Sequence, residues 1–429
     1  MNRPKVIFQY IKEQFIETGS GKPGNWFWSL LVLGLFFLPL GVFPSNVFLI
    51  TAIPFGLFML SGHFHFKWGL KNLAMLSYPL LFIFMAISLT YSFDLNIGIK
   101  LLSRSVPLFF FPIIFLFASS TEKHLIKIIN ALSLGLVFSF IINLISATNN
   151  SIYWDGGNLV FDTSLNRGYS FFESFNHGGN NFFGGEFAKH VHPSYLSCYL
   201  LLCVSHMIFK NENRKKMALV LVLLVYLFLL ASRAAFLCLG LLLIVYLFKS
   251  NGLGLFLKRV MIALSLFALY FFLNPRALNF YERMGVFFKM EQYDYTTSEQ
   301  SRALVYATAV DLIKKSPIVG YGIGDANEEL YIQYVDKNYI TLMNNRYNAH
   351  NQYFQTFIQM GVIGFLFLFF PLFIGVFKAN EKFVFSAFLV LSICLLFESM
   401  LIRYHGIIIY AVMVPLLIKL SGTISRNGA

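Results

Sequence analysis

The stretch 350–364 reads HNQYFQTFIQMGVIG and lies where a long polar segment runs into an apolar one. The apolar segment, 352–377, is long enough for an α-helix to cross a bilayer. A histidine and a side-chain amide therefore stand at the predicted membrane surface, with two glycines further along. We predict that the helix begins at about Asn351. This leaves His350 in a non-helical turn, because on a continuous helix it would point away from the polar side.

The composition is that of a polytopic membrane protein. Hydrophobic residues make up 57% of the chain and charged residues 12%, whereas a soluble domain carries about 25% charged residues. The apolar runs predict an all-α architecture of about twelve transmembrane helices. They are expected at 26–43, 46–61, 73–91, 101–119, 125–146, 191–209, 217–231, 234–248, 257–273, 352–377, 383–400 and 407–420.

The basic residues cluster on one side of this predicted bundle. The net charge is +13, and most Lys and Arg fall in the connections that an even number of helices places beside both termini. This is the positive-inside pattern, so both termini are predicted to be cytoplasmic and nucleic acid is not an expected partner. Residues 1–25 are expected to form a cytoplasmic segment, and 26–429 a single transmembrane domain with an uncleaved first helix.

Two outer connections, 147–190 and 274–350, are long, and loops of this length in a compact bundle are usually functional. The first is rich in Gly, Asn and aromatic residues and shows no helical period. The second is expected to contain a helix that starts with a capping box at 297–300. Its apolar face is expected to dock on the outer ends of the membrane helices, with Arg302 on the same face. That face comprises Val305, Ala309, Leu312 and Ile313.

Three residues on the predicted outer side suit transfer from a diphosphate. Arg233 and Arg302 carry planar forks of donors that match phosphate oxygens and stabilise the charge of a leaving diphosphate. His350 is a side chain that can accept a proton from an attacking hydroxyl. The sequence alone therefore makes these three residues the candidate catalytic group.

Three motifs in this order resemble the bacterial O-antigen ligase family: Ser232-Arg233, Ser301-Arg302 and His350-Asn351-x9-Gly361-x2-Gly364. The Pro- and Gly-containing segment 316–324 is also similar, and the likeness covers roughly 190–370. It implies a metal-independent, inverting glycosyltransferase of the C type in the bacterial inner membrane. Its site would be periplasmic, its donor an undecaprenyl diphosphate-linked glycan and its acceptor lipid A-core. Tyr306 departs from the pattern, because Leu often stands there.

Further polar residues near these motifs are candidates for substrate binding. The amides between 348 and 359 fall on one side if helical, which suggests a water-filled cavity, because amides in a membrane helix must face protein or water. Arg104 lies in an apolar run and faces a cavity or snorkels outward; Glu398 is either functional or a partner of Arg403. The candidate substrate-binding residues are Asn351, Gln355, His192, Tyr195, Arg104 and Tyr306.

No cofactor or metal is expected. All four cysteines fall inside apolar runs, and His190 and His192 have no acidic or Cys partner at ligand spacing. The glycines within 320–324 lack the strand and lysine of a nucleotide loop, which leaves a plain turn or backbone contact with the donor phosphate. We expect Gly361 and Gly364 to allow close helix packing rather than to bind a ligand.

The acceptor is left open by the sequence. A polymerase that uses a second carrier-linked glycan and a protein O-oligosaccharyltransferase would share this layout. A lipid or solute transporter is a further alternative, but transporters place ionisable residues near the middle of the membrane. Here these residues gather at the predicted outer edge.

Overall fold

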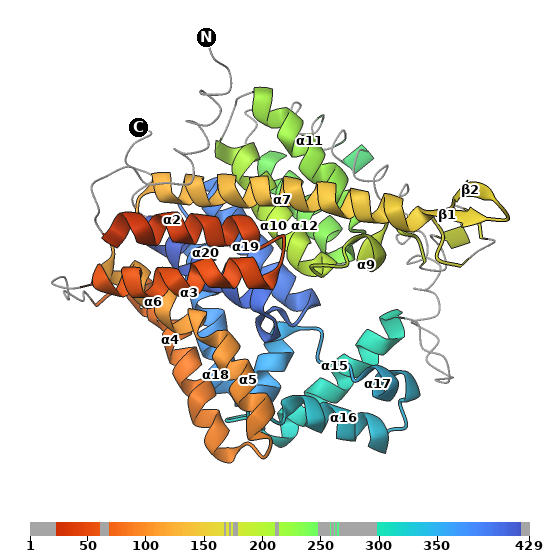
Figure 1. Ribbon diagram of the computed structural model, residues 1–429. Coiled ribbons are helices and arrows are strands. Elements are labelled where there is room, and N and C mark those ends of the chain that lie inside the picture. Colours follow the sequence, from red (N-terminus) through yellow and green to blue (C-terminus); the bar gives the residue numbers. More distant parts are fainter. Residues whose placement is uncertain are drawn as a thin grey trace, which may run out of the picture. The chain divides into compact units, whose positions relative to one another are not determined.

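The computed structural model describes residues 23–60, 68–166, 169–170, 173–174, 179–210, 214–247 and 298–421, with single positions between 258 and 265 (Figure 1). This part of the chain is mostly helical. The chain divides into two compact units, each described by itself below. The first comprises Met1–Ala52 and Ile126–Met284, and the second Ile53–Leu125 and Gly285–Ala429.

The first unit is built from apolar helices around α10. Its main helices are α2 (Pro23–Phe37), α7 (Glu122–Ser151), α10 (Pro193–Lys210), α11 (Arg214–Leu229) and α12 (Arg233–Leu247), and α3 (Val42–Phe58) begins in it. Almost all of α10 is buried, against α11 and α12. The Tyr226 hydroxyl of α11 bonds Ser139 and Asn143 of α7, both at 2.9 Å. Such bonds between apolar helices stabilise their packing.

The first long loop contains strands, which corrects the all-α expectation. Strand β1 (Ile152–Asp155) pairs with β2 (Asn158–Phe161) in an antiparallel hairpin. The two residues between them, Gly156 and Gly157, have φ of 54° and 87°, the backbone that a two-residue hairpin turn requires. The Gly-Gly pair between apolar and aromatic residues was the sequence signal. A short helix, α9 (Gly184–Phe187), follows.

The second unit holds the remaining apolar helices and the described part of the second loop. Its elements are α4 (Leu70–Ser88), η1 (Leu89–Tyr91), α5 (Leu95–Ser105), α6 (Pro107–Phe117), α15 (Ser298–Lys315), α16 (Ala326–Asp336), α17 (Ile340–Asn345), α18 (Gln352–Phe377), α19 (Lys382–Phe397), η2 (Met400–Ile402) and α20 (Tyr404–Leu420). Helix α20 is buried along nearly its whole length and packs on α4 and α6. A helix that is apolar all round must be buried in this way.

The helices identify a multi-pass membrane protein. Within the described ranges, four helical segments are long and apolar enough to cross a bilayer: Leu70–Tyr91, Leu95–Phe117, Glu122–Ser151 and Gln352–Phe377. Six shorter apolar helices accompany them. The span expected at 101–119 begins earlier, at Leu95, and is interrupted before Pro107. The predicted pair at 217–231 and 234–248 is confirmed as two helices, whereas the span expected at 257–273 lies outside the described residues.

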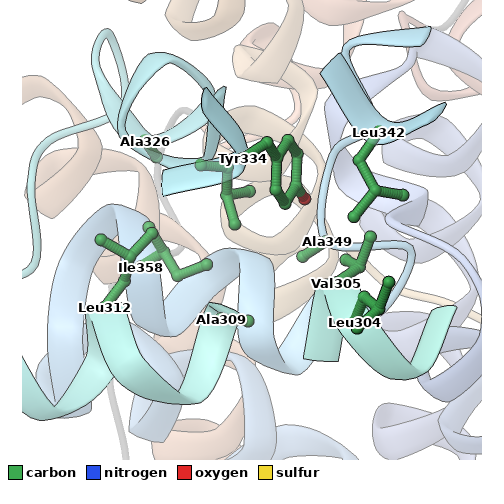
Figure 2. Close-up of a cluster of buried hydrophobic side chains, with 10 residues drawn as sticks. Leu304, Val305, Ala309, Leu312, Ala326, Tyr334, Leu342, Ala349 and Ile358 are labelled. Atoms are coloured by element: carbon green, nitrogen blue, oxygen red, sulfur yellow. The ribbon is translucent and has the colours of Figure 1, made fainter. Parts of the chain in front are cut away.

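The helix predicted in the second loop is confirmed as α15, although Thr297 of its predicted capping box lies outside the described residues. Figure 2 shows its apolar face, on which Val305, Ala309 and Leu312 are fully buried. Ile313 is partly buried and packs against the same cluster. The expected docking surface was only partly right. Most partners come from the loop itself, Leu330 and Tyr334 of α16 and Leu342 of α17, with Ile358 of α18. The loop therefore has a hydrophobic core of its own.

Candidate active site around His350

The helix expected at 352–377 is present as α18, but it is broken at Gly361. Gly361 has φ 60° and ψ −159°, outside the helical region. The rings of Tyr353 and Phe369 lie 6.4 Å apart, and those of Phe357 and Phe365 4.9 Å apart. Sixteen residues of straight helix would separate the first pair by about 24 Å. The two halves of α18 therefore fold back on each other.

The break leaves helical backbone groups without their usual partners, and buried backbone groups need partners. The segment 317–322 supplies them. Three hydrogen bonds join it to the break: Tyr321 N to Ile358 O at 2.8 Å, Gly322 N to Gln359 O at 2.9 Å, and Val362 N to Pro317 O at 2.9 Å. The Pro- and Gly-containing segment thus completes the interrupted helix.

Glycines make this close approach possible. A Cβ at Gly361 would collide with the backbone of Ile318, and one at Gly320 (φ 68°) would lie 2.5 Å from the Ile358 carbonyl oxygen. A Cβ at Gly364 would collide with Met360 across the fold-back. Only glycine fits such positions without strain. The expectation that Gly361 and Gly364 serve close packing is confirmed.

The backbone of 321–324 has no free donor for a phosphate. Tyr321 and Gly322 donate to α18, as above, while Ile323 N and Gly324 N each donate to a serine hydroxyl of the α4–α5 region, Ser88 and Ser92, at 3.3 Å. The next residue, Asp325, accepts from the backbone N–H groups of Phe93 and Asp94 at 2.7 and 2.8 Å. Of the two interpretations of this segment, the structure therefore supports a turn, held by protein contacts.

The turn predicted at His350 is confirmed. Asn351 is the N-cap of α18, and its side chain accepts from the backbone N–H groups of Tyr353 and Phe354 at 2.9 and 3.2 Å. His350 lies outside the helix with φ 44°, and its N–H donates to the Asn348 side chain at 2.8 Å. A positive φ is uncommon for residues other than glycine. The flanking asparagines hold this conformation.

The amide stripe faces protein, which corrects the expected water-filled cavity. Gln355 is fully buried; its side-chain oxygen accepts from Ala349 N at 3.1 Å, and its amide donates to Asn327 at 3.0 Å. Gln352 is also buried and accepts from Leu401 N at 2.6 Å. These side chains tie the start of α18 to the residues around it.

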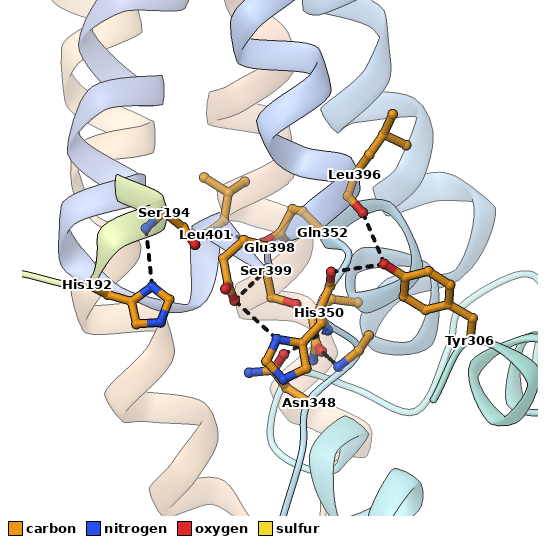
Figure 3. Close-up of polar contacts among 12 residues, drawn as sticks. His192, Ser194, Tyr306, Asn348, His350, Gln352, Leu396, Glu398, Ser399 and Leu401 are labelled. Atoms are coloured by element: carbon orange, nitrogen blue, oxygen red, sulfur yellow. Dashed lines mark hydrogen bonds and ion pairs between the residues drawn. The ribbon is translucent and has the colours of Figure 1, made fainter. Parts of the chain in front are cut away.

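A carboxylate lies beside the imidazole of His350 (Figure 3). Nδ1 of His350 is 3.6 Å from Oε1 of Glu398, and their side chains are 25% and 11% exposed. This Nδ1 is buried and makes no hydrogen bond to the described part of the chain. Glu398 also accepts from Ser399 N at 3.1 Å. The sequence left Glu398 open, as functional or as a partner of Arg403; the structure places its carboxylate at His350. A carboxylate this near to one ring nitrogen favours the tautomer that carries its proton on that nitrogen.

Tyr306 of α15 reaches the same turn. Its hydroxyl lies 3.4 Å from the His350 carbonyl and 3.3 Å from the Leu396 carbonyl. Burial raises the pKa of the Tyr306 phenol, the positive charge of Arg302 lowers it in part, and Glu398 raises it further. Arg302 is half-buried and makes no hydrogen bond or salt bridge within the described ranges. The phenol therefore interacts electrostatically with both the Arg302 guanidinium and the Glu398 carboxylate.

The four remaining predicted site residues belong to other elements. Arg104 is exposed in the last turn of α5, and no described contact joins it to His350. Three belong to the first unit: Arg233 begins α12, Tyr195 is buried in α10, and His192 accepts from Ser194 N at 3.4 Å just before α10. The second unit thus gathers His350, Asn351, Gln355, Arg302 and Tyr306 around one turn.

These features define a polytopic membrane protein with a paired histidine and carboxylate outside a broken helix. The family model described as O-antigen ligase matches residues 218–369. The match begins in α11 and ends within α18, and it includes all three motifs on which the sequence resemblance rests. That resemblance is confirmed over these residues. No curated protein matches the chain.

Proposed function

We propose that the protein transfers a saccharide from an undecaprenyl diphosphate carrier to a hydroxyl of lipid A-core, as an O-antigen ligase. The observation that carries the proposal is the His350–Glu398 pair. His350 stands in a turn at the start of the motif, inside the segment that matches the O-antigen ligase family, and Glu398 follows α19, beyond that segment. The match supports a glycan transferase; carrier, acceptor and residue roles are the proposal.

The chemistry is one displacement. The Glu398 carboxylate, 3.6 Å from Nδ1 of His350, favours a proton on that nitrogen, and Nε2 accepts the proton of the acceptor hydroxyl. The acceptor oxygen attacks the anomeric carbon of the donor sugar while the bond from that carbon to the diphosphate oxygen breaks. The diphosphate leaves with the bonding electrons, and Arg302 binds its oxygens. A single displacement inverts the anomeric configuration.

The proposed location follows from the distribution of charge. With basic residues gathered on the side of both termini, the termini are cytoplasmic and the His350 turn faces the periplasm. The membrane is then the bacterial inner membrane. Because the Arg302 guanidinium offsets charge on the leaving diphosphate, the reaction needs no metal ion, and transfer should persist in EDTA.

The test is a transfer assay with purified protein and carrier-linked glycan. Three acceptors are offered separately: lipid A-core, a second carrier-linked glycan and an exported protein. Product masses identify the acceptor, and the His350→Ala variant is the control. A product on lipid A-core supports ligation, whereas products on a carrier glycan or protein would replace it with polymerisation or protein glycosylation. Movement of intact donor across a vesicle without cleavage would indicate a transporter.

A further inference from the structure

Tyr306 stands on the same face of α15 as Arg302. The two residues are four positions apart, the spacing at which side chains on a helix are neighbours. The Tyr306 ring packs edge-on against Phe354 of α18, with centroids 5.4 Å apart. The aromatic ring therefore fastens the helix that carries Arg302 to the helix that begins beside His350.

The Tyr306 hydroxyl extends this contact to a third element. One carbonyl that it reaches belongs to His350, and the other belongs to Leu396, two residues before Glu398 in the last turn of α19. A phenol has a single proton, so it donates to one of these carbonyls at a time. One side chain thus contacts the elements that carry the arginine, the imidazole and the carboxylate.

These contacts change the role that the sequence suggested for Tyr306. A substrate-binding tyrosine would present its hydroxyl to the ligand. Here the hydroxyl is directed at two backbone carbonyls, and the side chain is half-buried. A ligand would have to displace both contacts to use it.

We infer that Tyr306 is a positioning residue that fixes the spacing of Arg302, His350 and Glu398; the inference rests on the proposed function. Displacement reactions depend steeply on how catalytic groups are placed, and a 1 Å shift can cost about 100-fold in rate. Loss of the hydroxyl would let the His350 turn and the end of α19 move independently. Loss of the hydroxyl should therefore lower kcat and leave donor binding unchanged.

The first experiment is Tyr306→Phe in the full-length protein, which keeps the ring and removes the hydroxyl. We expect kcat to fall about tenfold with the KM for the carrier-linked donor unchanged. Tyr321→Phe is the matched control, because the Tyr321 hydroxyl also donates to a backbone carbonyl of α15, that of Leu312, at 3.3 Å. This control should keep kcat within twofold of wild type.

A double-mutant cycle with Glu398→Gln separates positioning from general stabilisation. If Tyr306 acts through the His350–Glu398 pair, Tyr306→Phe should reduce the rate of Glu398→Gln by much less than tenfold, because coupled residues are not additive. If the double variant lost rate by the product of the two single losses, the residues would act independently and the inference would be overturned. A Tyr306→Phe rate within twofold of wild type, or a loss of rate that matches a loss of folded protein in thermal unfolding, would also overturn it.

The two hypotheses fail in different ways. If wild type transfers glycan and His350→Ala does not, the proposed function stands whatever Tyr306→Phe does. If wild type transfers nothing to any acceptor, the proposed function falls, and the positioning role falls with it.

Discussion

The two long loops differ in how much of their apolar surface they bury. The first forms a hairpin whose one face carries Trp154, Leu159 and Phe161, which are 72%, 62% and 61% exposed. The second buries Val305, Ala309 and Leu312 completely in a core shared by α15, α16, α17 and α18. Burial of large apolar side chains contributes about 1.5–3 kcal/mol each. The loop with its own core is the one that holds charged residues in fixed places, as a catalytic site requires.

The largest expected effect is that of His350→Ala in the second loop. Loss of a general base removes about 10²- to 10⁴-fold in rate. Transfer from carrier-linked glycan should be lost, while expression and binding of the carrier diphosphate, followed by thermal shift, persist. Activity within threefold of wild type would end the assignment of His350 as the base.

Arg302→Lys should come next, with a loss of about 100-fold in transfer. Lysine keeps the charge but cannot reproduce the planar fork that binds two oxygens at once. The same assay measures it, with Arg346→Lys as the control, since Arg346 is an exposed arginine of the same loop. Full turnover by Arg302→Lys would mean that bulk positive charge suffices.

Gly361→Ala tests whether the hydrogen-bonded contact between the α18 break and residues 317–322 stabilises the second loop. Its positive φ costs a non-glycine residue about 1–3 kcal/mol, and the added Cβ collides with the backbone of Ile318. We expect a lower thermal midpoint together with reduced transfer.

The matched control lies in the first loop. Gly157 also has a positive φ, of 87°, but a Cβ there meets nothing within 4 Å. Gly157→Ala should therefore weaken only the hairpin and leave transfer unchanged. If the two variants behaved alike, the comparison between the loops would lose its basis.

The smallest effect is expected for Trp154→Ser. The side chain is exposed on the first loop and is assigned no role in the reaction. Transfer should stay within twofold of wild type in the same assay. A tenfold loss would show that the hairpin takes part in catalysis or in acceptor binding.

The sequence predicted the features that depend on nearby residues. The apolar face of α15 repeats with helical spacing, and the turn at His350 follows from the motif and the polar side of α18. Both are confirmed. The Gly-Gly turn of the hairpin is equally local, but the two strands beside it are only four residues long, too short to give a clear alternation of apolar and polar residues.

The remaining features depend on contacts between distant residues. The break at Gly361 is stable because residues 317–322 make hydrogen bonds with its backbone groups. The sequence pattern within 352–377 contains no information about that distant segment. Glu398 contacts His350 although the two residues are 48 positions apart in the sequence. The sequence alone therefore left the role of Glu398 open. The apolar composition of 352–377 predicted one unbroken helix, because composition does not indicate where a helix changes direction.

The most direct test of the central claim is the anomeric configuration of the new linkage. The claim is that His350 activates an acceptor oxygen for a single in-line displacement of the carrier diphosphate. NMR coupling constants of the sugar that joins donor to acceptor, measured in the donor and in the purified product, report the configuration at that carbon. The account predicts inversion. Retention would require a covalent sugar–enzyme intermediate and would contradict the proposed role of His350 as the base of one displacement.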